Sequence, residues 1–269
     1  MTGLLIALAA LWGAAAGALL PRAAYRFSVP SEEPWRRTCP DGHPLGGWLG
    51  RARCRTCGKG QSGQSYGPGG SLLPGVTALV CAALAAATGT RPELAVWLLL
   101  APAGVLLSAV DLRVRRLPDP LTLPLAAAAL ALLGLVALVP EHAGSWPNAL
   151  SGALALGAGY WVLWRINPGG MGFGDVKLAL GAGAVLGWYG WDTVLLGTFA
   201  GFLLGALWGG LLVIARNSTF AYRGRAVDVR RVARELGVRY VLEGSVRTAG
   251  GRIRVTAQLV EAETARHIW

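Results

Sequence analysis

The chain has 269 residues, of which 54% are hydrophobic, and it combines a formal net charge of +11 with a mean hydropathy of +0.47. These values exclude an ordinary soluble globule and indicate a multi-pass membrane protein with basic loops. High basicity is also typical of nucleic-acid-binding proteins, but the arginines here stand mostly in short loops between apolar runs. We therefore expect membrane lipid as a partner, and no nucleic acid.

Apolar segments recur along most of the chain, and most of them approach the ~20 residues that a helix needs to cross ~30 Å of hydrocarbon. The predicted spans are residues 3–20, 72–87, 94–110, 121–139, 149–164, 176–189 and 193–214. The sequence thus predicts an all-α polytopic membrane protein of about seven transmembrane helices. The first span, within residues 1–20, lacks the basic start and the cleavage site of a signal peptide, so we expect it to be retained.

Glycines inside these spans would let neighbouring helices approach closely, because packing rather than hydrophobicity drives helix association in lipid. The candidates are Gly17, Gly152, Gly157, Gly181, Gly183, Gly201 and Gly205. A chain with 39 glycines also places some of them there without any packing role, so both interpretations stay open.

Basic residues orient the predicted spans, since short cytoplasmic loops carry an excess of lysine and arginine. The loop after the first span holds Arg22, Arg26, Arg36, Arg37, Arg51, Arg53, Arg55 and Lys59, and the loops after the third and fifth spans hold Arg113, Arg115, Arg116 and Arg165. The intervening loops carry little net charge. We expect these basic loops and the C-terminal tail in the cytoplasm, and the N-terminus outside.

Residues 21–71 form the predicted cytoplasmic loop, which contains three of the four cysteines. Three residues separate Cys39 from His43, and two separate Cys54 from Cys57. Three thiols and one imidazole suit a tetrahedral structural zinc ion, while reduced cysteines without a metal are the alternative. The reducing cytoplasm disfavours a disulfide. Cys81 lies in an apolar span and is interpreted as a small buried hydrophobic residue.

Two acidic residues stand at the predicted cytoplasmic ends of apolar segments. Asp111 follows the third span, and Asp175 follows Gly172-Phe173-Gly174 and precedes the sixth. An acid near the bilayer costs ~3 kcal/mol unless it lines a polar cavity or has a partner. Two carboxylates that share one water can divide the work of an aspartic protease, the ionised one taking a proton from water and the protonated one donating to the scissile carbonyl.

The order of these features resembles the prepilin peptidases, the type IV leader peptidases of the GxGD aspartic protease class, over about residues 1–213. The matching motifs are Asp111-Leu-Arg-Val-Arg-Arg-Leu-Pro118-Asp119 and Gly172-Phe-Gly-Asp175-Val-Lys177. The resemblance implies a membrane aspartic endopeptidase of the bacterial inner (plasma) membrane. It would cleave the leader peptide of type IV prepilin or pseudopilin substrates at the cytoplasmic face, in type IV pilus assembly and protein secretion.

The resemblance also assigns roles to single residues. Asp111 and Asp175 would be the catalytic pair, with Gly172, Gly174, Lys177 and Asp119 supporting the substrate or the backbone. Asp119 follows a proline and is interpreted as a turn or helix-cap acid rather than a third catalyst. Lys177 either biases the pKa of Asp175 or anchors the chain at the membrane interface. The two glycines are interpreted as a permissive backbone that leaves room for an extended substrate.

One departure from the family pattern concerns the cysteine loop. Many members carry two Cys-x-x-Cys pairs, and such members often also methylate the new N-terminus with S-adenosylmethionine. Here Cys39-x3-His43 replaces the first pair. The sequence therefore leaves N-methyltransferase activity and S-adenosylmethionine binding unsupported, while proteolysis needs no cofactor.

Residues 214–269 are polar and arginine-rich, unlike the predicted peptidase core at 72–213. Helical spacing over 227–236 ends at Gly237, and alternation over 240–246 and 252–259 predicts two strands joined by Gly250-Gly251. The run 227–247 resembles a small α/β module found between cyclase or winged-helix regulator domains and downstream TPR repeats. We expect a truncated soluble α/β tail that catalysis does not need.

Two other functions compete with the protease. A transporter or channel would use the acids as a proton relay, but relay acids usually sit in the middle of a span. A membrane-anchored regulatory protein built on the cysteine loop and the tail would leave the paired acids unexplained. The positions of Asp111 and Asp175 at the ends of spans favour the protease.

Overall fold

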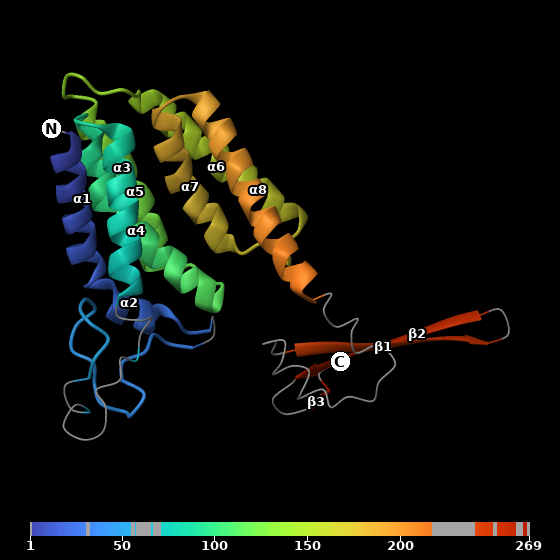
Figure 1. Ribbon diagram of the computed structural model, residues 1–269. Coiled ribbons are helices and arrows are strands. Elements are labelled where there is room, and N and C mark those ends of the chain that lie inside the picture. Colours follow the sequence, from blue (N-terminus) through green and yellow to red (C-terminus); the bar gives the residue numbers. More distant parts are fainter. Residues whose placement is uncertain are drawn as a thin grey trace. The chain divides into compact units, whose positions relative to one another are not determined.

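The structure is a computed structural model that describes residues 2–30, 33–54, 57, 66, 71–216, 240–249, 252–261 and 266–267, with side-chain surroundings up to residue 207. It is mostly helical (Figure 1). The helices are α1 (Thr2–Gly17), α2 (Leu20–Phe27), α3 (Leu72–Thr88), α4 (Glu93–Val114), α5 (Asp119–Val136), α6 (Trp146–Ile166), α7 (Phe173–Trp188) and α8 (Trp191–Arg216). Contacts divide the chain into two compact units, residues 1–197 and 198–269.

Every predicted span is helical, but the helix ends differ from the predicted span ends in ways that matter for the acids. Helix α4 continues to Val114, so Asp111 lies in its last turn rather than after it. Helix α7 begins at Phe173, so Asp175 lies in its first turn. Helix α8 crosses the predicted boundary at residue 213 and ends at Arg216.

The start of the cysteine loop is a short helix, where the sequence predicted loop from residue 21. Pro21 lies in the first turn of α2, a place where the missing backbone N–H costs nothing. Leu20, Ala24 and Phe27 are buried against α3 and α4, which explains why the segment folds back onto the bundle. The axes of α1 and α2 differ by 46°.

Length and composition identify a smaller number of membrane-crossing helices than the sequence predicted. Among the described residues, α4 and α5 are long and apolar enough to cross a bilayer, and the bent α1–α2 pair makes a third candidate. Helix α3 and the segment Trp191–Leu207 are apolar but shorter. The chain is thus a mostly helical protein with two or three candidate spans, and the seven-span arrangement stays a prediction.

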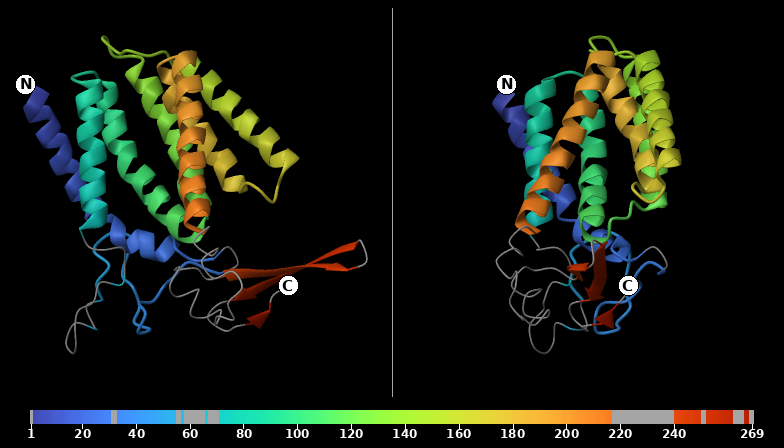
Figure 2. Two further views of the ribbon diagram at one scale, coloured as in Figure 1. Left: turned by 45° about the vertical axis from the view of Figure 1, so that its right-hand side comes forward. Right: turned by 90° about the vertical axis from the view of Figure 1, so that its right-hand side faces the viewer.

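Helices of the N-terminal unit run side by side (Figure 2). Some of them pack through small residues. A Cβ atom on Gly17 would lie 2.8 Å from the Leu73 carbonyl oxygen on α3, and one on Gly152 would lie 2.5 Å from the Gly183 carbonyl oxygen on α7. The predicted close approach is confirmed at these three glycines. Gly201 and Gly205 belong to the second unit, so for them both interpretations stay open.

The acid-bearing helix ends and the cysteine loop lie at one end of the N-terminal unit. Arg116, in the turn between α4 and α5, donates a hydrogen bond to the Pro30 carbonyl oxygen at 2.7 Å, and its guanidinium lies 4.4 Å from the Trp35 ring centre. The start of α7 reaches the same turn, because Gly174 packs on Leu117. The predicted spans alternate in direction, and on that basis both acids and the cysteine loop were expected on the same side. This arrangement agrees with that expectation.

The second unit contains the strands β1 (Tyr240–Ala249), β2 (Arg252–Glu261) and β3 (Arg266–His267). Strand β2 pairs antiparallel with both others, and Val246 stands opposite Val255 in the β1–β2 pair. The two predicted strands are confirmed. The predicted helix at 227–236 and the Gly250-Gly251 turn lie outside the described residues, so the α/β character of the tail stays a prediction.

Candidate active site

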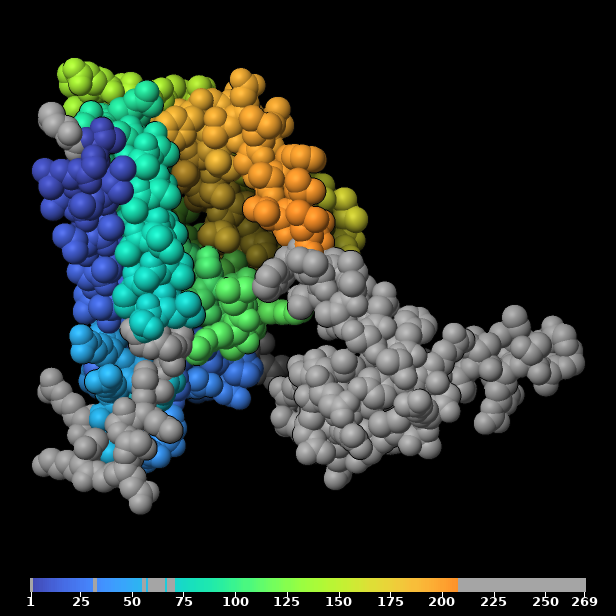
Figure 3. Space-filling model, in the orientation of Figure 1, coloured from blue at the N-terminus to red at the C-terminus, as the bar shows by residue number. Residues whose placement is uncertain are grey.

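A cavity of about 1240 Å³ lies between α3, α4, α5 and α7. Its wall is mostly apolar, and it extends from Asp111 and Asp175 at one end to Arg91 and Tyr189 near the opposite ends of α4 and α7. Figure 3 shows the N-terminal unit hollowed beside α3, with α7 visible deeper in the hollow. Both acids that the sequence singled out therefore line the same cavity, although they are far apart in the chain.

The carboxylate of Asp175 is held by the turn that precedes it. The backbone N–H of Gly172 donates to Asp175 Oδ2 at 3.2 Å, and the N–H of Asp175 donates to the Gly172 carbonyl oxygen at 3.1 Å. This is the acid half of a capping box, and the first turn of a helix is also where the helix dipole favours a negative charge. The position of this carboxylate is thus fixed by local sequence.

Asp111 approaches from the last turn of α4. The helix ends just after it, where Arg115 adopts the left-handed conformation (φ 49°) and donates its N–H to the Asp111 carbonyl oxygen at 2.7 Å. Asp175 precedes the predicted span 176–189. Burial raises the pKa of its carboxyl, and the negative charge of Asp111 raises this pKa further. The hydrogen bond from the Gly172 N–H lowers the pKa by a smaller amount. Two half-buried carboxylates that act on each other in this way can share one proton.

The two glycines before Asp175 serve close packing rather than an unusual backbone. Gly172 has φ −73°, and Gly174 also lies outside the left-handed region. A Cβ atom on Gly174 would lie 2.9 Å from Leu117 Cβ, so only glycine lets the start of α7 contact the α4–α5 turn this closely. At Gly174 the structure therefore indicates that the absence of a side chain permits close packing on Leu117, rather than that the backbone needs unusual freedom.

Lys177 forms an ion pair that the sequence did not indicate. Its Nζ lies 2.7 Å from Asp119 Oδ1 and 5.1 Å from the centre of the Phe173 ring. Asp119 is the first residue of α5, which fits the interpretation as a helix-start acid. The pair joins the N-terminal part of α7 to the first residue of α5.

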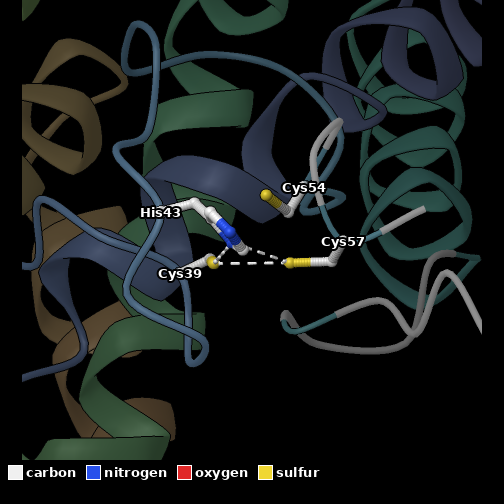
Figure 4. A group of neighbouring side chains, drawn as sticks. All are labelled: Cys39, His43, Cys54 and Cys57. Carbon is white, nitrogen blue, oxygen red and sulfur yellow. Dashed lines mark hydrogen bonds between the residues drawn. The ribbon is translucent and has the colours of Figure 1, made fainter. Parts of the chain in front are cut away.

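The predicted metal ligands of the cysteine loop also come together (Figure 4). The ligand atoms of Cys39, His43, Cys54 and Cys57 all lie within 4.8 Å of one another. Cys39 Sγ is 3.7 Å from Cys57 Sγ and 3.6 Å from His43 Nδ1. Zinc–sulfur bonds of ~2.3 Å at tetrahedral angles require sulfur atoms ~3.8 Å apart, so this donor set fits a zinc ion.

A neighbouring acid affects one of these thiols. Cys57 donates a hydrogen bond to Asp41 Oδ2 at 3.0 Å, and this bond is the main reason that the pKa of the Cys57 thiol is raised. Zinc binds the thiolate, so metal binding at this site would release a proton.

Sequence reasoning missed two polar residues inside the helix bundle. Glu93 is fully buried, and its Oε1 accepts hydrogen bonds from Ala143 N–H at 2.7 Å and from Trp188 Nε1 at 3.4 Å. Glu93 directly precedes the span predicted at 94–110, and nothing in its spacing indicates burial. Tyr160 lies in the apolar span predicted at 149–164 and is half-buried. Its phenol, in a span whose other hydroxyl belongs to Ser151, was the available signal.

Comparison with known proteins gives two kinds of match. Residues 94–210 match the profile of the type IV leader peptidase family. The chain is 36% identical over 185 residues to the prepilin leader peptidase/N-methyltransferase of Aeromonas salmonicida (strain A449), covering 65% of this chain and 57% of that protein. It is also 36% identical over 177 residues to the prepilin leader peptidase/N-methyltransferase of Klebsiella pneumoniae, covering 63% and 72%.

A third relative is not a leader peptidase and matches only a short stretch of this chain. A stretch of 60 residues is 63% identical to a protein of Rhizobium meliloti (strain 1021) that is named "Putative adenylate cyclase 3", covering 22% of this chain and 10% of that protein. This match bears out the second resemblance, to a module associated with cyclases. The chain spans a little over half the length of the Aeromonas relatives. No solved structure matches it significantly.

Proposed function

The chain belongs to the type IV leader peptidase family, and we propose that it is a membrane aspartic endopeptidase that cleaves the leader peptides of type IV prepilin-like substrates. The observation that carries this proposal is the convergence of Asp111 and Asp175 on one cavity, where their charges interact. A single acid at either position would have no partner with which to divide the proton transfers.

In this proposal the two carboxylates activate one water molecule. The ionised carboxylate removes a proton from the water, whose oxygen attacks the scissile carbonyl, and the protonated carboxylate donates its proton to the carbonyl oxygen. Mutual repulsion keeps one proton on the pair. Gly174 and the ion pair between Lys177 and Asp119 would keep the acid-bearing turn of α7 against the α4–α5 turn.

We further propose the topology that the basic loops support. About seven helices would cross the bacterial inner membrane, with the N-terminus outside and both acids, the cysteine loop and the tail in the cytoplasm. A leader peptide would then reach the acids from the cytoplasm, while the largely apolar cavity wall faces the membrane interior. The proposed function involves no nucleic-acid partner.

Zinc is proposed as a structural ion of the cysteine loop. Cys39, His43, Cys54 and Cys57 would hold it, and with four protein ligands it would leave no open position for water or substrate. Its contribution would be to fold the loop. The relatives' names include an N-methyltransferase, but the altered first ligand pair of this loop supports no such activity, and no cofactor is needed for the proteolysis.

The test is a leader-cleavage assay with purified full-length protein and a prepilin leader peptide. Asp111→Asn and Asp175→Asn should each reduce the cleavage rate at least ~100-fold, the usual contribution of acid–base catalysis. The matched control is Asp192→Asn, an acid in the first turn of α8 as Asp175 is in the first turn of α7. Substantial cleavage by either of the first two variants, at equal expression, would refute the assignment of the pair.

A further inference from the structure

The turn between α4 and α5, residues 115–118, connects to both candidate acids. Asp111 lies just before this turn, in the last turn of α4. Inside it, Leu117 packs on Gly174, the residue that directly precedes Asp175 at the start of α7. A displacement of the α4–α5 turn would therefore change the position of one acid relative to the other.

Arg116, the neighbour of Leu117 in this turn, contacts a different part of the protein. Its guanidinium donates a hydrogen bond to the Pro30 carbonyl oxygen at 2.7 Å and lies 4.4 Å from the centre of the Trp35 ring. Both residues belong to the cysteine loop. A hydrogen bond from a cation is stronger than one between neutral groups, and the attraction between the cation and the aromatic ring adds to it. Arg116 thus attaches the α4–α5 turn to the cysteine loop.

The part of the loop that Arg116 contacts is itself fixed to helix α2. The Trp35 ring lies 5.1 Å from the ring of Phe27, which is buried in the core that α2 forms with α3 and α4. The next residue, Arg36, donates its backbone N–H to the Arg26 carbonyl oxygen at 3.2 Å. Arg116 therefore holds the turn against a segment that is packed on the helix bundle.

A simpler interpretation is that Arg116 only orients the chain, as one of the basic residues on the cytoplasmic side. Orientation depends on charge and not on a particular contact. The neighbouring Arg115 carries the same charge on an exposed side chain, whereas Arg116 is half-buried. The two arginines can therefore separate the effect of the charge from the effect of the contact.

We propose that Arg116 is a positioning residue of the acid pair: by fastening the α4–α5 turn to the cysteine loop, it holds that turn where Asp111 and Asp175 line one cavity. Its role in catalysis rests on the proposed function above, but the contact itself does not. Leu117 is among the residues that line the cavity and Arg116 is not, so Arg116 acts through the turn and does not touch the substrate.

Arg116→Gln tests this proposal in the full-length protein, because it removes the cation and keeps a polar side chain. A misplacement of ~1 Å can cost ~100-fold in rate, so we expect kcat for leader cleavage to fall about tenfold. KM should change less than twofold, since the substrate loses no contact. Arg116→Lys should be about threefold faster than Arg116→Gln, because its ammonium can still donate to Pro30 but stacks less well on Trp35.

The matched control is Arg115→Gln, which removes the same charge from the same turn and should leave kcat within twofold of the wild type. Equal kcat values for the two glutamine variants would overturn the proposal. So would a raised KM with an unchanged kcat in Arg116→Gln, or an Arg116→Lys variant no faster than Arg116→Gln.

A second measurement does not depend on activity. The Tm values of Arg116→Gln, Trp35→Leu and the double variant, in one detergent, form a cycle that isolates the contact between the two side chains. The loss of Tm in the double variant should be smaller than the sum of the single losses by roughly 1–4 °C. Additive losses would overturn the proposal, whether or not the wild type cleaves a leader peptide.

The two measurements separate this inference from the proposed function. If the wild type cleaves no leader peptide, the proposed function fails and the catalytic role of Arg116 fails with it, while the Tm cycle still decides the contact. If Arg116→Gln does not fold, Trp35→Leu replaces it in the kinetic comparison and Arg116→Lys replaces it in the Tm cycle. An unchanged kcat in Trp35→Leu would then overturn the proposal.

Discussion

Replacing Gly152 by alanine should force α6 and α7 apart, because both sides of this contact are backbone. A Cβ atom at Gly152 would lie 2.5 Å from the Gly183 carbonyl oxygen and 2.9 Å from Gly187 Cα. Ordinary contacts begin near ~3.4 Å, so the helices would have to separate by roughly 1 Å, and such overpacking costs ~1–3 kcal/mol. Alanine recovers up to ~1 kcal/mol through its helix propensity. We expect a net destabilisation of ~1–2 kcal/mol.

Gly159→Ala is the matched control, since it makes the same change seven residues further along the same helix. A Cβ there would meet nothing within 4 Å, so only the gain in helix propensity remains and the protein should be equally or slightly more stable. The two variants should then differ by the overpacking cost of ~1–3 kcal/mol, or roughly 2–12 °C in Tm for a chain of this size. Thermal unfolding of both proteins in the same detergent measures this difference.

The same displacement should reach the acid pair. Helix α7 carries Asp175 in its first turn, and a misplacement of ~1 Å can cost ~100-fold in rate, so leader cleavage by Gly152→Ala should fall at least tenfold. Gly159→Ala should cleave like the wild type. Equal Tm values for the two variants would refute the close packing of α6 on α7, and a destabilised but fully active Gly152→Ala would refute its link to the acids.

Three further predictions concern the ion pair, the metal site and the tail. Lys177→Met should lower the rate of leader cleavage several-fold but Tm only slightly, because a partly exposed ion pair contributes at most ~1 kcal/mol to stability. The charge swap Asp119→Lys/Lys177→Asp should restore much of the activity, and no recovery would contradict the pairing. Metal analysis should find one zinc ion in the purified protein and in Cys81→Ala, but none in Cys54→Ser/Cys57→Ser, and equal zinc in all three would refute the ligand set. Deleting residues 217–269 should leave cleavage within about twofold, because both acids and the cavity lie in the first unit; complete loss of cleavage in a normally inserted protein would show that the tail belongs to the enzyme.

Local properties of the sequence were enough to identify the class of protein and its candidate acids. Hydrophobic runs predicted the order of the helices, since burial in lipid requires apolar side chains whatever the helix packs against. The segments around Asp111 and Asp175 carried the family resemblance, because each motif lies within a few consecutive residues. The spacing of Cys39, His43, Cys54 and Cys57 likewise sufficed to predict that they converge.

The pairing of distant side chains was decided only by the tertiary structure. A helix that is apolar all round gives no amphipathic signal for its packed face, so the sequence did not indicate that Gly152 rather than Gly159 contacts another helix. For the same reason the sequence did not indicate that Gly157 of α6 packs against Leu180 of α7. The partner of Lys177 depended on where α5 begins relative to α7, which is a matter of how the helices pack and not of any spacing along the chain.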